Sequence, residues 1–243
     1  MNPSELKMRQ LFDYDTWTYT YLIYDPETRE AALIDTVQEQ VERDLQLIEE
    51  LGLKLKYVMD THVHADHITG ADAIRKATGA KGVVAFGTHV PCADIFLKDG
   101  EAVELGRFKI KALETPGHTD GCVSYYVAGR VFTGDALLIR GTGRTDFQQG
   151  SSDKLFDSIT QKLFTLPDET LVYPGHDYRG LSVSTIAEEK QFNPRVGGNK
   201  SKAEFIEIMK HLKLAMPKKI QMAVPANMAC GSLEKKAQVP PLH

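Results

Sequence analysis

A short segment rich in histidine places the strongest constraint on the fold of this chain. Thr61-His62-Val63-His64-Ala65-Asp66-His67 follows an apolar run at residues 56–59, which predicts a buried strand, and precedes a helix predicted over residues 69–78. Imidazole and carboxylate groups are common ligands of divalent metals, and the end of a strand holds them rigidly. One buried histidine is often only a satisfied core residue, but three histidines and an aspartate within six positions favour a metal site.

Three further candidate ligands also follow predicted strands. They are His118, Asp135 and His176, and each is preceded by glycine. A glycine lets the chain turn sharply and return the next side chain over the end of the sheet. Taken singly, each is typical of an ordinary loop histidine or turn aspartate. The shared pattern instead predicts that all three join the histidine segment in one site.

Strands and helices alternate in two halves of the chain, which predicts one α/β domain over residues 1–243. Two β-rich runs, 19–24 and 30–34, suit a hairpin, and the apolar spacing after Val37 predicts a helix that ends at Gly52. Residues 195–243 are predicted to form a C-terminal extension packed on the domain, irregular from Pro217. Further strands are predicted at 81–86, 101–113 with a break at Gly106, 122–127, 130–133 and 170–173, and further helices at 152–164, 183–191 and 202–212.

Composition and charge exclude several functional classes. The chain is 42% hydrophobic and 26% charged, an ordinary globular balance. No segment approaches the roughly 18 to 20 apolar residues of a membrane span, and the start does not resemble a signal peptide. The net charge of −4 argues against binding nucleic acid. The extension is basic, with nine Lys and Arg against three Glu, which suits either a small anionic substrate or an ordinary solvated helix surface.

The three cysteines, Cys92, Cys122 and Cys230, are odd in number and far apart. They predict neither a disulfide framework nor a paired-cysteine zinc site. We expect Cys92 and Cys122 to be packing residues in a reducing compartment, namely the bacterial cytoplasm. The mitochondrial matrix stays open as an alternative, because a removed transit peptide leaves no trace.

The histidine segment, followed in order by His118, Asp135 and His176, resembles the signature of the metallo-β-lactamase superfamily over about residues 10–190. The resemblance implies an αβ/βα sandwich with its metal site along the edge between two sheets. Within the superfamily, the chain is most similar to the persulfide dioxygenase branch. Four segments carry this likeness: Thr61-His62-Val63-His64-Ala65-Asp66-His67-Ile68-Thr69-Gly70, Gly143-Arg144-Thr145-Asp146-Phe147-Gln148-Gln149-Gly150, Pro174-Gly175-His176-Asp177-Tyr178 and Pro225-Ala226-Asn227-Met228-Ala229-Cys230-Gly231.

This resemblance implies one Fe(II) per chain, held by His62, His118 and Asp135, which would also be catalytic. Two imidazoles and one carboxylate form the facial ligand set of non-haem Fe(II) oxygen enzymes and leave positions open for other ligands. The other polar residues of the motifs would surround these ligands and orient them. They are His64, Asp66, His67, His176 and Asp177.

The implied reaction is the oxidation of glutathione persulfide by O₂ and water to sulfite and glutathione. Arg144 is the predicted clamp for a glutathione carboxylate, with an ion pair to a nearby aspartate as the alternative. Tyr178 is predicted to bring its hydroxyl to the substrate as a catalytic and binding residue, or else to pack over the site. By resemblance, Asn227 would bind the glutathione backbone and Cys230 would lie close to the pocket, unless it is only a small buried hydrophobe.

The ligand spacing alone permits a dinuclear zinc hydrolase equally well. That alternative is a hydroxyacylglutathione thioesterase like glyoxalase II, with a second ligand set from the same motifs and Asp135 shared between two metals. The short extension looks less like the larger helical domain of that branch. A metal-loaded scaffold that binds proteins through the basic extension is a third hypothesis. For the enzyme we expect glutathione persulfide and O₂ as partners, no nucleic acid or membrane, and a homodimer as a further possibility.

Overall fold

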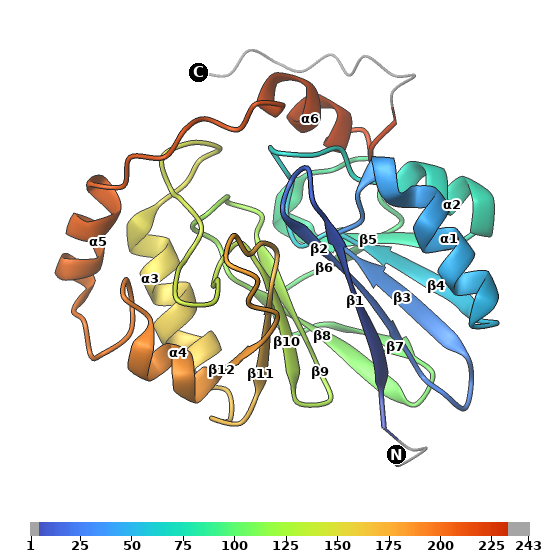
Figure 1. Ribbon diagram of the computed structural model, residues 1–243, viewed down its shortest axis with the longest axis horizontal. Coiled ribbons are helices and arrows are strands. Elements are labelled where there is room, and N and C mark those ends of the chain that lie inside the picture. The colour runs from blue at the N-terminus through green and yellow to red at the C-terminus, as the bar shows by residue number, and fades with distance from the viewer. Residues whose placement is uncertain (1–4, 233–243) are drawn as a thin grey trace.

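Two six-stranded β-sheets packed face to face form the centre of the structure (Figure 1). The computed structural model describes residues 5–232. The first sheet has the order β1 (Lys7–Asp13), β2 (Thr18–Tyr24), β3 (Glu30–Ile34), β4 (Lys54–Met59), β5 (Lys81–Ala85) and β6 (Ile95–Leu97). The second has the order β12 (Ser184–Thr185), β11 (Leu171–Pro174), β10 (Arg130–Gly134), β9 (Val123–Val127), β8 (Phe108–Glu114) and β7 (Ala102–Leu105).

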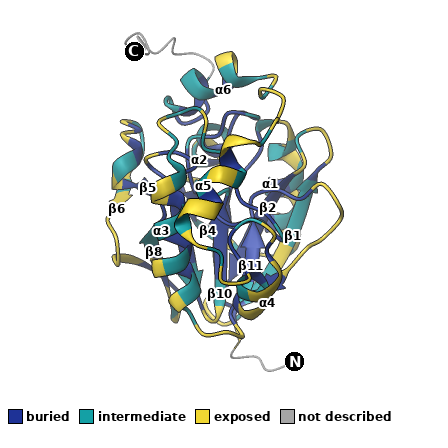
Figure 2. Cartoon of the chain, turned by 90° about the vertical axis from the view of Figure 1, so that its left-hand side faces the viewer, coloured by how far each residue is buried: buried dark blue, intermediate teal, exposed yellow. Residues whose placement is uncertain are grey.

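Helices cover the outer face of each sheet. α1 (Val41–Glu50) and α2 (Ala71–Thr78) pack on the first sheet, and α3 (Ser152–Gln161), α4 (Ile186–Phe192) and α5 (Lys202–Lys210) pack on the second. Figure 2 shows the strands buried inside and the exposed residues gathered on helices and loops. The predicted αβ/βα sandwich is therefore confirmed. None of the helices in residues 5–232 is long and apolar enough to cross a membrane.

Local sequence explains most of these elements. β2 and β3 form the predicted antiparallel hairpin, and every residue of β2 is buried because it faces helices on one side and the second sheet on the other. Gly52 follows α1 with φ +58, a left-handed conformation that glycine adopts without strain. Ser151 caps α3 by accepting a hydrogen bond from the backbone N–H of Lys154.

Four elements differ from the sequence predictions, and one of them is β12, which lies at the start of the helix predicted over residues 183–191. β1 and β6 were not predicted, and the segment after Pro217, predicted to be irregular, contains the helix α6 (Ile220–Asn227). Ala223 and Ala226 of this helix are buried against Ile68, and that packing stabilises a helix despite an internal proline. α6 lies at the end of the molecule opposite the N-terminus (Figure 1). The predicted extension runs on to residue 243, but residues 233–243 lie outside the described part.

Candidate metal centre and adjoining pocket

The predicted ligands follow strands of both sheets and meet at one edge of the sandwich. His62 follows β4, His118 follows β8, Asp135 directly follows β10 and His176 follows β11. The Nε2 atoms of His118 and His176 lie 3.6 Å from different carboxylate oxygens of Asp135. The ring centroids of His62 and His118 are 5.0 Å apart. Residues separated by more than a hundred positions therefore form one cluster.

The glycines before Asp135 and His176 permit close packing at this edge. A Cβ atom at Gly134 would lie 2.3 Å from the Thr61 hydroxyl oxygen, and one at Gly175 would lie 2.7 Å from the Asp135 carboxylate. Gly134 also has φ +49, which disfavours other residues. Larger residues at these positions would displace Asp135 or Thr61.

Backbone carbonyl groups fix the orientation of two imidazoles. His118 Nδ1 donates to the carbonyl oxygen of Arg144 at 2.7 Å, and His176 Nδ1 donates to that of Trp17 at 3.1 Å. A nitrogen that donates to a carbonyl carries the proton, so in the neutral ring Nε2 is left with a free lone pair. In both rings this lone pair lies on the side of Asp135, which is the arrangement that a metal ligand requires.

Burial and neighbouring charges set the protonation of the cluster. Burial, reinforced by the adjacent imidazoles, holds the pKa of His62 and of His64 well below the usual value, so both rings are neutral and available as ligands. Burial alone would raise the pKa of Asp135, but the imidazoles of His176, His118 and His62 outweigh it and lower the pKa, which keeps the carboxylate ionised. His62 and His64 therefore present neutral nitrogens and Asp135 an anionic oxygen. At His176 the carboxylates of Asp135 and Asp66 outweigh burial and raise the pKa to about 9.

These residues fit a divalent metal. One ligand atom each from His62, His118 and Asp135 lies within 4.8 Å of the others. Asp135 Oδ1 is buried and has no hydrogen-bond partner among the described residues, although an unpaired buried carboxylate oxygen is costly. A cation bound at this point would satisfy it.

A second donor group adjoins the first. His64, Asp66 and His67 also bring ligand atoms within 4.8 Å of one another, and His64 Nδ1 and His67 Nε2 are buried without a partner in the part of the chain that the structure describes. His67 Nδ1 bonds to Asp66 at 2.9 Å, and His176 Nε2 lies 3.6 Å from Asp66. The donor set therefore suits one metal at the first group and also offers donors to a second.

A cavity of about 560 Å³ opens beside His118, Asp135 and His176. This volume is within the range typical of small-molecule sites. The guanidinium groups of Arg179 and Arg195 line it and donate to the carbonyl oxygens of Ile139 and Thr142. No carboxylate among the described residues forms an ion pair with either arginine, so their charges face the cavity uncompensated. Burial, together with the charge of Arg179, lowers the pKa of Arg195.

Arg144 lines the same cavity but its guanidinium is already paired. It forms two 2.6 Å hydrogen bonds to the carboxylate of Asp146 and one of 2.6 Å to the carbonyl oxygen of Ala215, and it lies over the ring of Phe147. The ion-pair alternative therefore describes this residue, and the predicted role as a free carboxylate clamp does not fit. Arg144 instead fastens the segment around Ala215 to the wall of the cavity.

Tyr178 and Asp177 follow His176 but face different surroundings. The Tyr178 ring stacks on the His176 ring with an interplanar angle of 7°, is 63% exposed, and has no hydrogen bond from its hydroxyl within residues 5–232. It lines the cavity, so its hydroxyl is available to a bound molecule. The Asp177 carboxylate accepts hydrogen bonds from the backbone N–H groups of Arg179 and Leu181, and thus shapes the turn beside the site.

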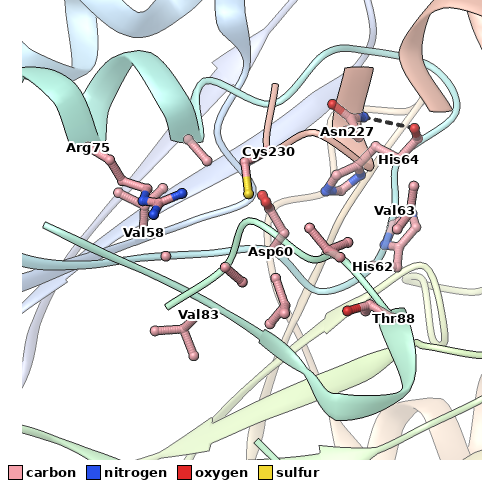
Figure 3. Close-up of a pocket in the computed structure, with 15 residues that line it drawn as sticks. Val58, Asp60, His62, Val63, His64, Arg75, Val83, Thr88, Asn227 and Cys230 are labelled. Atoms are coloured by element: carbon pink, nitrogen blue, oxygen red, sulfur yellow. Dashed lines mark hydrogen bonds between the residues drawn. The ribbon is translucent and has the colours of Figure 1, made fainter. Parts of the chain in front are cut away.

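Asn227 lies against the histidine loop rather than in the large cavity. Its Nδ2 donates to the carbonyl oxygen of His64 at 2.9 Å (Figure 3) and to that of His67 at 2.8 Å. Its Oδ1 accepts from the backbone N–H of Thr69 at 2.8 Å. The amide thus has no free donor for glutathione, contrary to the predicted contact. Asn227 is a positioning residue for the loop that carries His62.

The predicted absence of disulfides is wrong. Cys92 and Cys230 form a disulfide bond across 138 positions, with their Cα atoms 6.0 Å apart. Cys92 was expected to be a packing residue and Cys230 to lie close to the pocket, because their separation in sequence hid their proximity in the fold. Cys230 lines a small cavity of about 10 Å³ beneath the histidine loop, not the large one. Cys122 is free and buried, as predicted.

Sequence reasoning missed Asp35, which supports the same loop. Its buried carboxylate accepts hydrogen bonds from the backbone N–H and the hydroxyl of Thr61, and lies 3.2 Å from His64 Nε2. Asp35 directly follows β3, the same strand-end position that identified the other candidates. The strand-end position alone would have found it, but Asp35 follows Ile34 and lacks the preceding glycine of the other candidates.

Comparison with known proteins agrees with this geometry. The model of the metallo-beta-lactamase superfamily matches residues 18–91 and 90–176. The persulfide dioxygenase ETHE1 of Mus musculus, described as mitochondrial, is 49% identical over 96% of this chain and 90% of its own length. The Homo sapiens protein of the same name is 49% identical over 92% of this chain and 88% of its own length. The crystal structure of ETHE1 from Myxococcus xanthus superposes with a TM-score of 0.91 at 57% identity, covering 93% of this chain and 100% of that one. This chain belongs to the metallo-β-lactamase superfamily and, within it, to the family of the ETHE1 persulfide dioxygenases.

Proposed function

We propose that this protein is a persulfide dioxygenase that oxidises glutathione persulfide with one Fe(II) per chain. The observation that carries the proposal is the cluster of His62, His118 and Asp135, the last two of which line a cavity with two arginines that form no ion pair among the described residues. The names and high identity of the relatives support the same reaction.

His62, His118 and Asp135 would hold the iron beside the cavity. Bound Fe(II) supplies the redox chemistry that lets a persulfide react with O₂. The protein contributes orientation: the Arg144 carbonyl holds His118, and the neighbouring imidazoles keep Asp135 ionised. These interactions preset the ligands before substrate arrives.

Arg179 and Arg195 are the proposed carboxylate clamp, in place of Arg144. Glutathione carries two carboxylates, and a guanidinium binds a carboxylate through two parallel hydrogen bonds. A carboxylate bound there would compensate charges that have only neutral partners in the protein. Tyr178 would place its free hydroxyl on the substrate near the His176 side of the cavity. Anchoring the peptide in this way holds the sulfane sulfur near the metal ligands, and proximity lowers the barrier.

The overall reaction balances as glutathione persulfide plus O₂ plus H₂O giving glutathione, sulfite and two protons. Both oxygen atoms of O₂ and one from water end on the sulfane sulfur, and the S–S bond of the persulfide breaks. The sulfane sulfur is oxidised by four electrons and O₂ is reduced by the same number. The glutathione thiolate leaves with the bonding pair and is protonated.

The test compares Fe(II)-loaded protein with and without air. We expect aerobic addition of glutathione persulfide to give sulfite and equal O₂ uptake, and anaerobic addition to give no sulfite. An absence of O₂ uptake by fully iron-loaded protein would refute the proposal.

A dinuclear zinc thioesterase is the second candidate, because His64, Asp66 and His67 offer a second donor group. Metal analysis of protein purified under low oxygen separates the two. Two zinc ions per chain with turnover of S-lactoylglutathione would favour the thioesterase, and one iron per chain favours the dioxygenase.

We further propose a cytoplasmic location and a homodimer, with no nucleic-acid or membrane partner. The net charge of −4 supports the absence of nucleic-acid binding. Cell fractionation tests the location and light scattering at several concentrations tests the dimer.

A further inference from the structure

The Cys92–Cys230 disulfide joins two parts of the chain that both contact the histidine loop. Cys92 lies between β5 and β6, and Cys230 follows α6. The carbonyl oxygen of Cys230 accepts a hydrogen bond from the N–H of Asp72 at 2.9 Å, in the first turn of α2, immediately after the histidine loop. The disulfide therefore attaches the end of the described chain to the β5–β6 connection, and the hydrogen bond attaches it to the start of α2.

Besides the disulfide, this C-terminal segment is held by the Lys219–Glu39 ion pair and by the hydrogen bond from Arg144 to the Ala215 carbonyl. α6 buries only a small apolar cluster, with Ala223 and Ala226 against Ile68. The stretch 213–216, which leads to it, is exposed. Asn227 lies three positions before Cys230 and makes the three hydrogen bonds that hold the loop (Figure 3). Releasing Cys230 would thus loosen the residue that positions His64 and His67.

The surroundings of the two sulfurs permit the bond to open. Cys92 is partly buried and Cys230 is 6% exposed, so Cys92 is the more accessible residue of the pair. Two separate thiols need more room than a bonded pair, and the cavity of about 10 Å³ lined by Cys230 and Asp60 provides some (Figure 3). In reducing compartments, disulfides are rare and those that form are usually transient or redox-sensing.

We propose that Cys92 and Cys230 are a redox-sensitive tether that controls the rigidity of the histidine loop. A glutathione thiolate attacks Cys92 Sγ, the S–S bond breaks, and Cys230 leaves with the electron pair and is protonated. A second glutathione thiolate attacks the glutathione sulfur of the mixed disulfide, which frees Cys92 as a thiol and gives glutathione disulfide. The protein gains two electrons and two glutathiones lose them. The choice of glutathione as reductant rests on the proposed function, since it is the product of that reaction.

The experiment measures thiols and backbone exchange, not turnover. Iron-loaded protein is equilibrated at a series of ratios of glutathione to glutathione disulfide, alkylated, and analysed by intact mass. We expect the number of alkylated thiols per chain to rise from one to three as the ratio of glutathione to glutathione disulfide rises. In Cys122→Ala the number should rise from zero to two. On reduction, hydrogen exchange at residues 62–72 and 220–231 should become about tenfold faster, as expected when a local anchor is lost.

Cys92→Ser is the matched control, because it removes the bond and keeps Cys230. Its exchange should equal that of the reduced wild type at every ratio, and it should release iron to a chelator as fast as the reduced protein does. Three alkylated thiols at every ratio, or equal exchange rates in the bonded and reduced wild type, would overturn the proposal. Both readouts are independent of persulfide oxidation, so a failure of the proposed function leaves them interpretable.

Discussion

Replacing Asn227 with alanine tests whether the histidine loop depends on a single buried amide. The substitution removes three hydrogen bonds and leaves two carbonyl oxygens and one N–H without partners in a buried site. At about 1 kcal/mol for each neutral bond, plus a desolvation cost for groups left unpaired, the free energy of unfolding should fall by about 3 to 5 kcal/mol. Since domains are stable by only about 5 to 15 kcal/mol, the variant should fold but unfold at clearly lower urea concentration.

The same substitution should weaken iron binding by about 10- to 100-fold, because the residues that orient metal ligands typically contribute that much. Urea unfolding of metal-free protein gives the first quantity, and competition with a chelator gives the second. Asn193→Ala is the matched control: Asn193 is also buried, and its amide bonds to the Gly141 carbonyl and to Glu189, away from the histidine loop. We expect a similar loss of stability there with iron affinity unchanged. Equal loss of iron affinity in both variants would show that Asn227 has no specific role.

Three further predictions concern the ligands, the pocket and pH. Asp135→Asn should weaken metal binding at least about tenfold and abolish O₂ uptake, and normal iron content with full uptake would show that Asp135 is not a ligand. Arg195→Ala should raise KM for glutathione persulfide by about 10- to 100-fold and leave kcat little changed. Arg195→Lys should show a smaller rise in KM. An unchanged KM in Arg195→Ala would show that Arg195 does not bind the substrate carboxylate. Burial raises the pKa of Asp44 from 3.8 to about 6, although the charge of Arg43 opposes the shift. Between pH 3.8 and pH 6 the native state therefore binds more protons than the unfolded state. The free energy of unfolding falls as the pH rises through this range. The free energy of unfolding of Asp44→Asn, measured with urea, should therefore increase relative to that of the wild type by about 2 to 3 kcal/mol from pH 4 to pH 8. A difference between the two proteins that stays constant with pH would contradict this reasoning.

The sandwich and the metal cluster could be predicted because their signals are local or repeat along the chain. Apolar periodicity identified α1 and α3, and strand ends identified His62, His118 and Asp135. β6 escaped because three residues are too short for a pattern to be distinct. α6 escaped because Pro217 and Pro225 favour irregular structure, whereas the burial of Ala223 and Ala226 against Ile68 that stabilises the helix is a contact between distant segments.

The errors at the site share one cause, which is that they concern contacts between distant segments. Nothing near Cys92 indicates Cys230, because the contact depends on the docking of α6 above β5 and β6. Asn227 likewise bonds to Thr69, which is 158 positions away in the sequence, and Asp35 bonds to Thr61, which is 26 positions away. Local sequence identifies a residue type suited to hydrogen bonding, but not the partner that the fold provides.

The arginines of the pocket illustrate a property that local sequence does not reveal. Arg144 is two positions from Asp146, and the two side chains pair in the structure, so the guanidinium that looked best suited to a substrate carboxylate already has one. Arg179 is also two positions from an aspartate, but the Asp177 carboxylate is occupied by backbone N–H groups, and Arg179 extends instead to a neutral carbonyl. Spacing to an acidic residue therefore does not decide which arginine is free. What decides is whether the carboxylate of the neighbouring aspartate already accepts hydrogen bonds from other donors. We therefore expect substitution of Arg179 or Arg195, rather than of Arg144, to affect substrate binding.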